Sequence, residues 1–197
     1  MKSIEVTPEE MQRRLVRFKM LTPRSKAFAN TTGIPAEVNE WFAADQNYTL
    51  MAPEMPDNSP ITKLSAIRGG DWGDAISVSI AVCKPGSGPQ LHLHANTVEC
   101  FFCLKGRFDL RWGDTGEHSV LMEPWDFLSV PPGVMRTFIN VGEEEGALLV
   151  IIQGKKGEFR DTQHSPEAAK YVAEHWGPEM VSRLEGIGRR FTATVDD

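Results

Sequence analysis

Three residues in the stretch "GPQLHLHANTVECFFCLKG" are of types that can bind one metal ion together. His92 and His94 stand one residue apart, and Glu99 follows after a short connection. Residues two apart on a β-strand point to the same face, so the two imidazoles can chelate an ion. If Glu99 also points inward from the next strand, the set suits non-haem iron, and manganese, nickel or zinc as well. An HxH pair is also common on strands that bind no metal. The surrounding sequence pattern therefore has to decide whether this pair is a metal site.

The residues from 61 to 155 have the pattern of closely spaced β-strands. Short runs rich in β-branched and aromatic residues alternate with turns such as "KPGSG", "PPG" and "GEEEG". Short turns with no intervening helices predict an antiparallel barrel or sandwich. The runs lie at 61–67, 76–82, 98–104, 107–113, 118–122, 126–130, 134–141 and 147–153.

Two motifs in this segment resemble those of the cupin superfamily. The first, G(x)5HxH(x)3–4E(x)6G, is matched by Gly86, His92, His94, Glu99 and Gly106. The second, G(x)5PxG(x)2H(x)3N, aligns with "WDFLSVPPGVMRTFIN" and is matched at Pro131, Gly133 and Asn140. The resemblance covers about half of the chain, residues 61–155. It implies an all-β fold, the antiparallel double-stranded β-helix or jelly-roll barrel of the cupins.

The second motif departs from the family pattern at two positions. Trp125 replaces its first glycine, and Arg136 stands where the family usually supplies a third histidine ligand. Arginine keeps its proton and cannot donate a lone pair, so this chain offers three protein ligands at most. Strand parity predicts that Arg136 faces inward, near Glu99. Two interpretations stay open: Arg136 holds an anionic substrate beside a metal site, or it pairs with Glu99 in a metal-free barrel.

The resemblance implies a function as well as a fold. Our leading hypothesis is a metal-dependent enzyme, an Fe(II) dioxygenase acting on an aromatic or other small organic acid. In it, His92, His94 and Glu99 bind the metal, with manganese, nickel or zinc as alternatives to iron, and Arg136 positions an anionic group of the substrate. The alternative is a non-catalytic small-molecule binding or sensing protein in which Arg136 pairs with Glu99. Many cupins are dimers, so we expect a homodimer.

The N-terminal extension, residues 1–60, combines a helix with an irregular arm. Thr7 and Glu10 form a capping box, and apolar residues follow at helical spacing. This pattern predicts a helix over 7–20 with one apolar face to bury. Residues 21–60 are rich in turn formers and predict an irregular arm. We expect the extension to pack on the barrel or on a partner chain.

The C-terminal extension, residues 156–197, has a helical pattern. Ser165 and Pro166 predict the start of a helix that Gly177 can end, and a second helical segment runs from 178 to 190. We expect its apolar stripe to be buried in the same way. His164 and His175 fall in this tail and His118 at a hairpin edge, so we expect all three to lie outside the site.

The composition excludes several functional classes. A net charge of −6 and a pI near 5.4 argue against nucleic-acid binding, which needs a basic face. The longest aliphatic run is of strand length, so no membrane span is predicted. The first thirty residues lack a signal-peptide pattern, and three cysteines do not suggest a disulfide framework, so we expect the cytoplasm. No helix-turn-helix that would indicate a transcriptional regulator is predicted.

Overall fold

The structure is a computed structural model of the 197-residue chain. It describes residues 3, 5–12, 14–25, 29, 32–52, 67–68, 76–155, 157–159 and 161–194. The strand predicted at 61–67 lies outside these residues except for Ile67. No helix among the described residues is long and apolar enough to cross a membrane.

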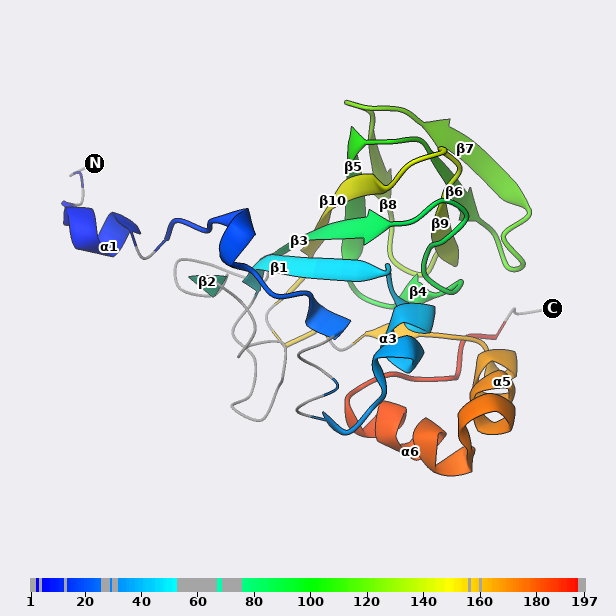
Figure 1. The fold of residues 1–197 in the computed structure, drawn as a ribbon. Helices are drawn as coiled ribbons and strands as arrows, with labels where there is room; N and C mark the ends of the chain where they lie inside the picture. Colours follow the sequence, from blue (N-terminus) through cyan, green and yellow to red (C-terminus); the bar gives the residue numbers. More distant parts are fainter. Residues whose placement is uncertain are drawn as a thin grey trace.

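The centre of the molecule is a barrel of two facing sheets (Figure 1). The six-stranded sheet has the order β2-β1-β3-β10-β5-β8, and a three-stranded sheet has the order β7-β6-β9. Neighbouring strands are antiparallel except β1 and β2. The strands are β1 (Gln46–Ala52), β2 (Ile67–Arg68), β3 (Ile76–Cys83), β5 (Val98–Lys105), β6 (Phe108–Trp112), β7 (His118–Met122), β8 (Phe127–Val130), β9 (Arg136–Asn140) and β10 (Gly146–Gln153). The predicted all-β antiparallel barrel is confirmed.

A small third sheet pairs β4 (Leu93–His94) with β11 (Thr162–Gln163). In this pairing His94 lies opposite Thr162 and Leu93 opposite Gln163. The sheet therefore holds the segment that follows β10 next to β4, the strand that contains His94.

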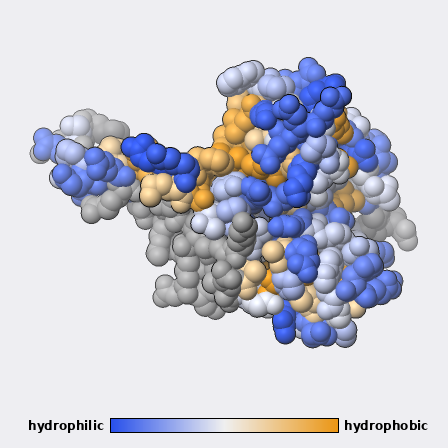
Figure 2. All heavy atoms as spheres, viewed as in Figure 1, coloured by the Kyte–Doolittle hydropathy of each residue, from blue (hydrophilic) through white to orange (hydrophobic). Residues whose placement is uncertain are grey.

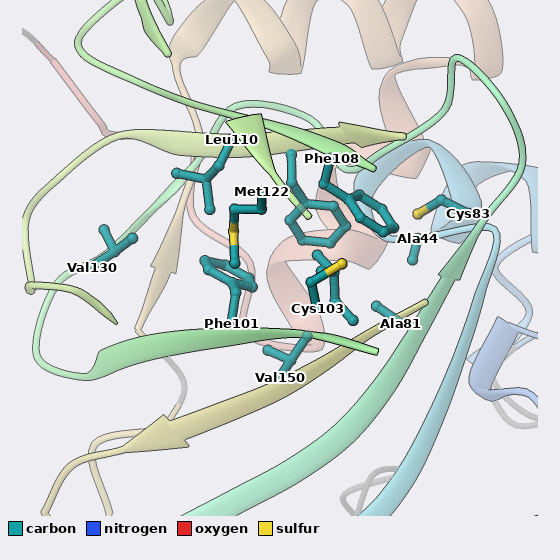
Figure 3. Close-up of a cluster of buried hydrophobic side chains, with 12 residues drawn as sticks. Ala44, Ala81, Cys83, Phe101, Cys103, Phe108, Leu110, Met122, Val130 and Val150 are labelled. Atoms are coloured by element: carbon teal, nitrogen blue, oxygen red, sulfur yellow. The ribbon is translucent and has the colours of Figure 1, made fainter. Parts of the chain in front are cut away.

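The barrel interior is filled from the alternating inward positions of its strands. In β5, Glu99, Phe101 and Cys103 are buried while the residues between them are partly exposed, which confirms the predicted inward face. Figure 3 shows Phe101 and Cys103 of β5 pointing toward Phe108 and other side chains of the facing sheet. In β5 a period of two thus buries one face of the strand and orients Glu99 toward the interior.

Two elements inside the predicted irregular arm at 21–60 show that this prediction is wrong. Helix α3 (Ala36–Phe42) and strand β1 are regular, and β1 pairs with β3 from Gln46↔Val82 onward. The sequence of β1, "QNYTLMA", opens with polar residues and sits beside turn formers. Its strand conformation comes from pairing with a segment some thirty residues away, which no local pattern announces.

The helices form a second layer at the β4 end of the barrel (Figure 1). Helix α5 (Pro166–Trp176) begins after Ser165 and ends at Gly177, as predicted, whereas α6 (Pro178–Gly186) ends before the predicted Arg190. Apolar residues of α3, α5 and α6 make a separate buried cluster around Val38, Val172 and Leu184. This helical layer closes over the β4–β11 sheet.

The N-terminal helix is shorter than the predicted 7–20. Thr7 and Glu10 form the expected capping box, with hydrogen bonds of 2.8 and 3.2 Å, but α1 covers only Pro8–Gln12. A 3-10 turn, η1 (Phe18–Met20), follows. Helix α1 buries none of its residues, so nothing stabilises a longer helix there.

The apolar residues of this arm stay largely accessible. Met11 is 57% exposed and Leu15 is 55% exposed, and α1 projects away from the body (Figure 1). Only Phe18 has a ring contact there, with its centroid 4.7 Å from that of Tyr48. Figure 2 shows apolar surface on the adjoining face of the barrel. That a partner chain covers the arm stays a prediction.

Candidate metal centre

The strand ends near the helical layer bring the three candidate ligands together. His94 lies in β4 and Glu99 in β5, and His92 exchanges backbone hydrogen bonds of 3.1 and 2.8 Å with Arg136 of β9. All three candidate side chains are buried. One nitrogen of each imidazole and one carboxylate oxygen lie within 4.8 Å of one another. This geometry agrees with the expectation, made from their spacing in the sequence, that the three side chains converge.

The ring of His94 is oriented by a buried carboxylate. Its Nδ1 lies 2.7 Å from Oδ1 of Asp161, and a carboxylate oxygen can only accept, so Nδ1 carries the proton. The Oδ2 atom of Asp161 accepts from Asn96 N at 3.0 Å and from the Thr97 amide and hydroxyl at 2.8 Å. Burial alone would raise the pKa of Asp161, but these hydrogen bonds outweigh it and lower the pKa to about 2. In its neutral form His94 therefore presents its lone pair on Nε2.

The ring of His92 is fixed in the same tautomer by the backbone. Its Nδ1 lies 2.7 Å from the carbonyl oxygen of Gln90 and donates to it, which leaves the lone pair on Nε2. Burial, followed by the positive charge of Arg136 and the neighbouring histidines His94 and His164, holds the pKa of His92 well below its usual range. A neutral imidazole with a free Nε2 is the form that binds a metal.

The two oxygens of Glu99 have different surroundings. Arg136 donates from Nε at 2.9 Å and from Nη2 at 2.7 Å, both to Oε2. Its Nη1 reaches the carbonyl oxygens of His92 and Val134 at 3.4 and 3.5 Å. The Oε1 atom of Glu99 instead lies 4.0 Å from Nε2 of His94, too far for a hydrogen bond. Arg136 thus neutralises Glu99 through one oxygen and leaves the other directed at the histidines.

The three remaining donor atoms suit a divalent ion. Two imidazole nitrogens and one carboxylate oxygen are the donor set of mononuclear iron sites, and also bind manganese, nickel or zinc. Ligand atoms held at about 2.0–2.2 Å from one ion lie about 3 Å apart, so donors that are up to 4.8 Å apart must close by up to about 2 Å. Each donor is the end of a side chain, and side-chain rotation supplies such a movement. With three protein ligands, further coordination positions stay open.

Two residues beside the site were not anticipated from the sequence. Asp161 was not singled out, and His164 was assigned to the helical tail; it is not one of the three donors, but it lies beside His92. His164 has no exposed surface, and its ring centroid is 5.6 Å from that of His92. Burial, then the charge of Arg189, lowers the pKa of His164 to about 3. Both residues follow the last long strand of the barrel and reach the site through the β4–β11 pairing, so no local spacing revealed them.

The other polar candidates stay outside the donor set. Cys103 is buried in the core and Cys100 is partly exposed, because two residues three apart on a strand point to opposite faces. His118 on β7 and His175 on α5 are exposed. Trp125 keeps the left-handed backbone of the glycine it replaces, with φ of 80°, and is 77% exposed.

A comparison with known proteins identifies the domain that carries these residues. Residues 79–152 match the family described as the cupin domain. Among solved structures, the chain is similar to a cupin 2 conserved barrel domain protein from Salinispora arenicola, with 18% identity and a TM-score of 0.41 over 55% of this chain and 74% of that chain. No curated protein matches the chain.

Two further solved structures give similar values. A double-stranded β-helix protein from Klebsiella pneumoniae has 16% identity and a TM-score of 0.39 over 42% of this chain and 70% of its own. The Cnp3 cupin domain of Schizosaccharomyces pombe has 15% identity and a TM-score of 0.38 over 41% of this chain. The chain spans 57% of the length of that domain. Similarities at this level identify no activity. The barrel segment at 79–152, which holds His92, His94, Glu99 and Arg136, is a cupin domain.

Proposed function

We propose that His92, His94 and Glu99 bind one divalent metal ion, and that the protein is a mononuclear metal-dependent oxidoreductase of the dioxygenase type. The substrate is a small aromatic or other organic acid. Fe(II) is the metal we expect first, with manganese, nickel and zinc as alternatives. We expect the enzyme to act as a homodimer in the cytoplasm.

The observation that carries this proposal is the set of three unengaged donors. The Nδ1 atoms of both histidines are occupied by Gln90 and Asp161, and Oε2 of Glu99 is occupied by Arg136. What is left, two Nε2 atoms and Oε1, faces a common point. Convergence of such atoms, with the other polar atom of each side chain held by a protein partner, is typical of a metal site.

The charge of the site supports an acidic substrate. Glu99 is balanced by Arg136, and Asp161 is the one further carboxylate beside the site among the described residues, so a bound dication would keep a net positive charge. A metal ion held this way supplies Lewis acidity at its open positions. An organic carboxylate or phenolate brings the compensating charge. Because Arg136 is 1% exposed and already bound to Glu99, its proposed role in positioning that group requires the two side chains to separate.

The two hydrogen bonds from Arg136 to one oxygen of Glu99 also favour a second candidate function. If the guanidinium replaces the charge of a metal permanently, the barrel is a metal-free protein that binds or senses a small molecule. The two functions differ in whether the purified protein retains and rebinds a metal.

Elemental analysis of protein purified without an affinity tag tests the proposal. We expect close to one metal per chain after reconstitution with Fe(II) under anaerobic conditions, and loss of metal in His92→Ala, His94→Ala and Glu99→Ala with the barrel still folded. His118→Ala, an exposed histidine of the same barrel, is the matched control and should retain the metal. Asp161→Asn keeps all three donors and should weaken binding about 10–100-fold.

Far less than one metal per chain in the wild type, after reconstitution with Fe(II), Mn(II), Ni(II) and Zn(II), would contradict the metal site and favour the metal-free candidate. Metal retained equally by the wild type and all three alanine variants would place the ion elsewhere. If the metal binds, oxygen consumption with a panel of small aromatic and aliphatic acids tests the dioxygenase assignment.

A further inference from the structure

A second cationic cluster lies in the helical layer, outside the metal centre. Arg189 follows α6 and contacts the ring of Phe42 from α3 and the side chain of His164. His164 lies between Arg189 and the candidate metal ligands, because it contacts the guanidinium of Arg189 and also the ring of His92. Arg24 of the N-terminal extension adds a second positive charge beside Arg189.

The contacts of Arg189 leave its charge without a counter-ion. Its Nη1 lies 3.0 Å from Nε2 of His164, which accepts and is therefore unprotonated. Its guanidinium carbon stands 4.4 Å from the centre of the Phe42 ring. Its Nε is buried and has no hydrogen-bond partner. Among the residues that the structure describes, no carboxylate pairs with Arg189.

The surroundings of Arg189 disfavour the charged form of its guanidinium. Burial, and then the charge of Arg24, lowers the pKa of Arg189 to about 9. Burial also lowers the pKa of Arg24 to about 10. A neutral imidazole and an aromatic face satisfy part of the guanidinium but cancel none of its charge. The neighbouring Arg190 differs, because it is exposed and donates at 3.0 Å to the carbonyl oxygens of Glu185 and Arg189.

We propose that Arg189 is an anion-binding subsite for a small oxyanion, a carboxylate or a phosphate group. The buried Nε–H and the adjacent Nη2 form the fork of the guanidinium that matches two oxygens of such a group. Arg189 is partly exposed as a whole residue, but its Nε is buried, so an anion that binds this fork must displace neighbouring side chains. The subsite is separate from the metal centre and does not require a metal.

Titration of metal-free wild-type protein with anions tests the subsite. Calorimetry with inorganic phosphate and, separately, with succinate distinguishes a phosphate from a carboxylate ligand. We expect one of them to bind at one site per chain and to raise the melting temperature by about 5 °C or more at 100-fold excess over Kd. Arg189→Met should weaken that binding at least tenfold, whereas the matched control Arg190→Met should not change it.

The melting temperature without anion separates a binding role from a structural one. Removing an uncompensated charge should leave Arg189→Met as stable as the wild type or more so, and Arg189→Lys should bind more weakly than the wild type because the fork is lost. Phosphate also stabilises proteins in general, so only the difference between wild type and Arg189→Met counts.

Three results overturn the proposal. The first is a wild type that binds neither anion. The second is equal binding by the wild type and Arg189→Met. The third is an Arg189→Met protein that melts several degrees lower and whose melting temperature rises with anion as much as that of the wild type, because Arg189 is then a packing residue.

Discussion

The barrel wall and the helical layer each hold a buried guanidinium beside a histidine, but they compensate its charge differently. On the wall, Arg136 donates two hydrogen bonds to one oxygen of Glu99. In the helical layer, the contacts of Arg189 with described residues are to the Phe42 ring and to the neutral His164, neither of which is charged. The first cation is balanced inside the protein, and the second is balanced only when an anion arrives. The same residue type therefore stabilises the fold in one place and prepares it for a ligand in the other.

The largest expected difference between the two regions appears when each arginine is truncated. Arg136→Met leaves Glu99 as an uncompensated buried anion, so metal-free protein should lose about 3–5 kcal/mol of unfolding free energy. Arg189→Met removes an uncompensated cation and should change stability by less than about 1 kcal/mol. Urea unfolding at neutral pH measures both. Equal losses of unfolding free energy in the two variants would show that the charges of Arg136 and Arg189 are not compensated differently.

A double variant sharpens the same test. Arg136→Met combined with Glu99→Gln removes both charges of the wall, and much of the lost stability should return. No recovery would mean that Arg136 stabilises the barrel by packing rather than by pairing with Glu99.

The next effect in size is a pH dependence of the helical layer. The pKa of His164 is about 3 in the folded protein, against 6.5 when unfolded. Because the folded pKa is the lower one, the stabilisation is complete above pH 6.5 and is lost as the pH falls from 6.5 toward 3. Between pH 7 and 5 this amounts to about 2 kcal/mol.

The variant His164→Gln isolates this dependence in metal-free protein, because glutamine can still accept from Arg189. It should lose less stability than the wild type between pH 7 and 5, and the exposed control His118→Gln should lose as much as the wild type. His92, whose pKa is also lowered, contributes to the slope of all three proteins, so the difference between them is the quantity to compare. An unchanged slope in His164→Gln would show that His164 is not held neutral.

The smallest expected effect concerns the aromatic face that covers Arg189. Phe42→Leu keeps an apolar side chain but removes the ring, and its cost should be larger when Arg189 is present. A double-mutant cycle with Arg189→Met should give a coupling of about 0.5–2 kcal/mol. A coupling of zero would leave the Phe42 ring as packing alone.

The barrel was more predictable from the sequence than the helical layer, for a physical reason. Most strands from β3 to β10 coincide with runs of β-branched and aromatic residues between short turns, and in β5 the burial alternates with a period of two. The inward position of Glu99 and Arg136 followed from that alternation. Strand β1, by contrast, carries no such pattern, and its conformation depends on pairing with β3.

The candidate site was predictable to the same extent. His92, His94 and Glu99 lie within eight positions, so their convergence needed only one turn between two strands. Asp161 and His164 lie more than sixty positions further along the chain, and only the pairing of Thr162 with His94 brings them to the site. Whether a metal binds there stays a prediction, because spacing and geometry define a donor set and not its occupant.

The hydrogen bonds on Glu99 also restrict how this carboxylate can behave as a ligand. Carboxylates in many metal sites swing between one-oxygen and two-oxygen coordination, which lets the coordination number change during a reaction. Both donors from Arg136 hold the same oxygen, Oε2, so that oxygen is not free to turn toward an ion. Glu99 is thereby restricted to a single oxygen. As long as Arg136 stays paired with Glu99, a change in coordination number at this centre would have to come from the small molecules that enter and leave it.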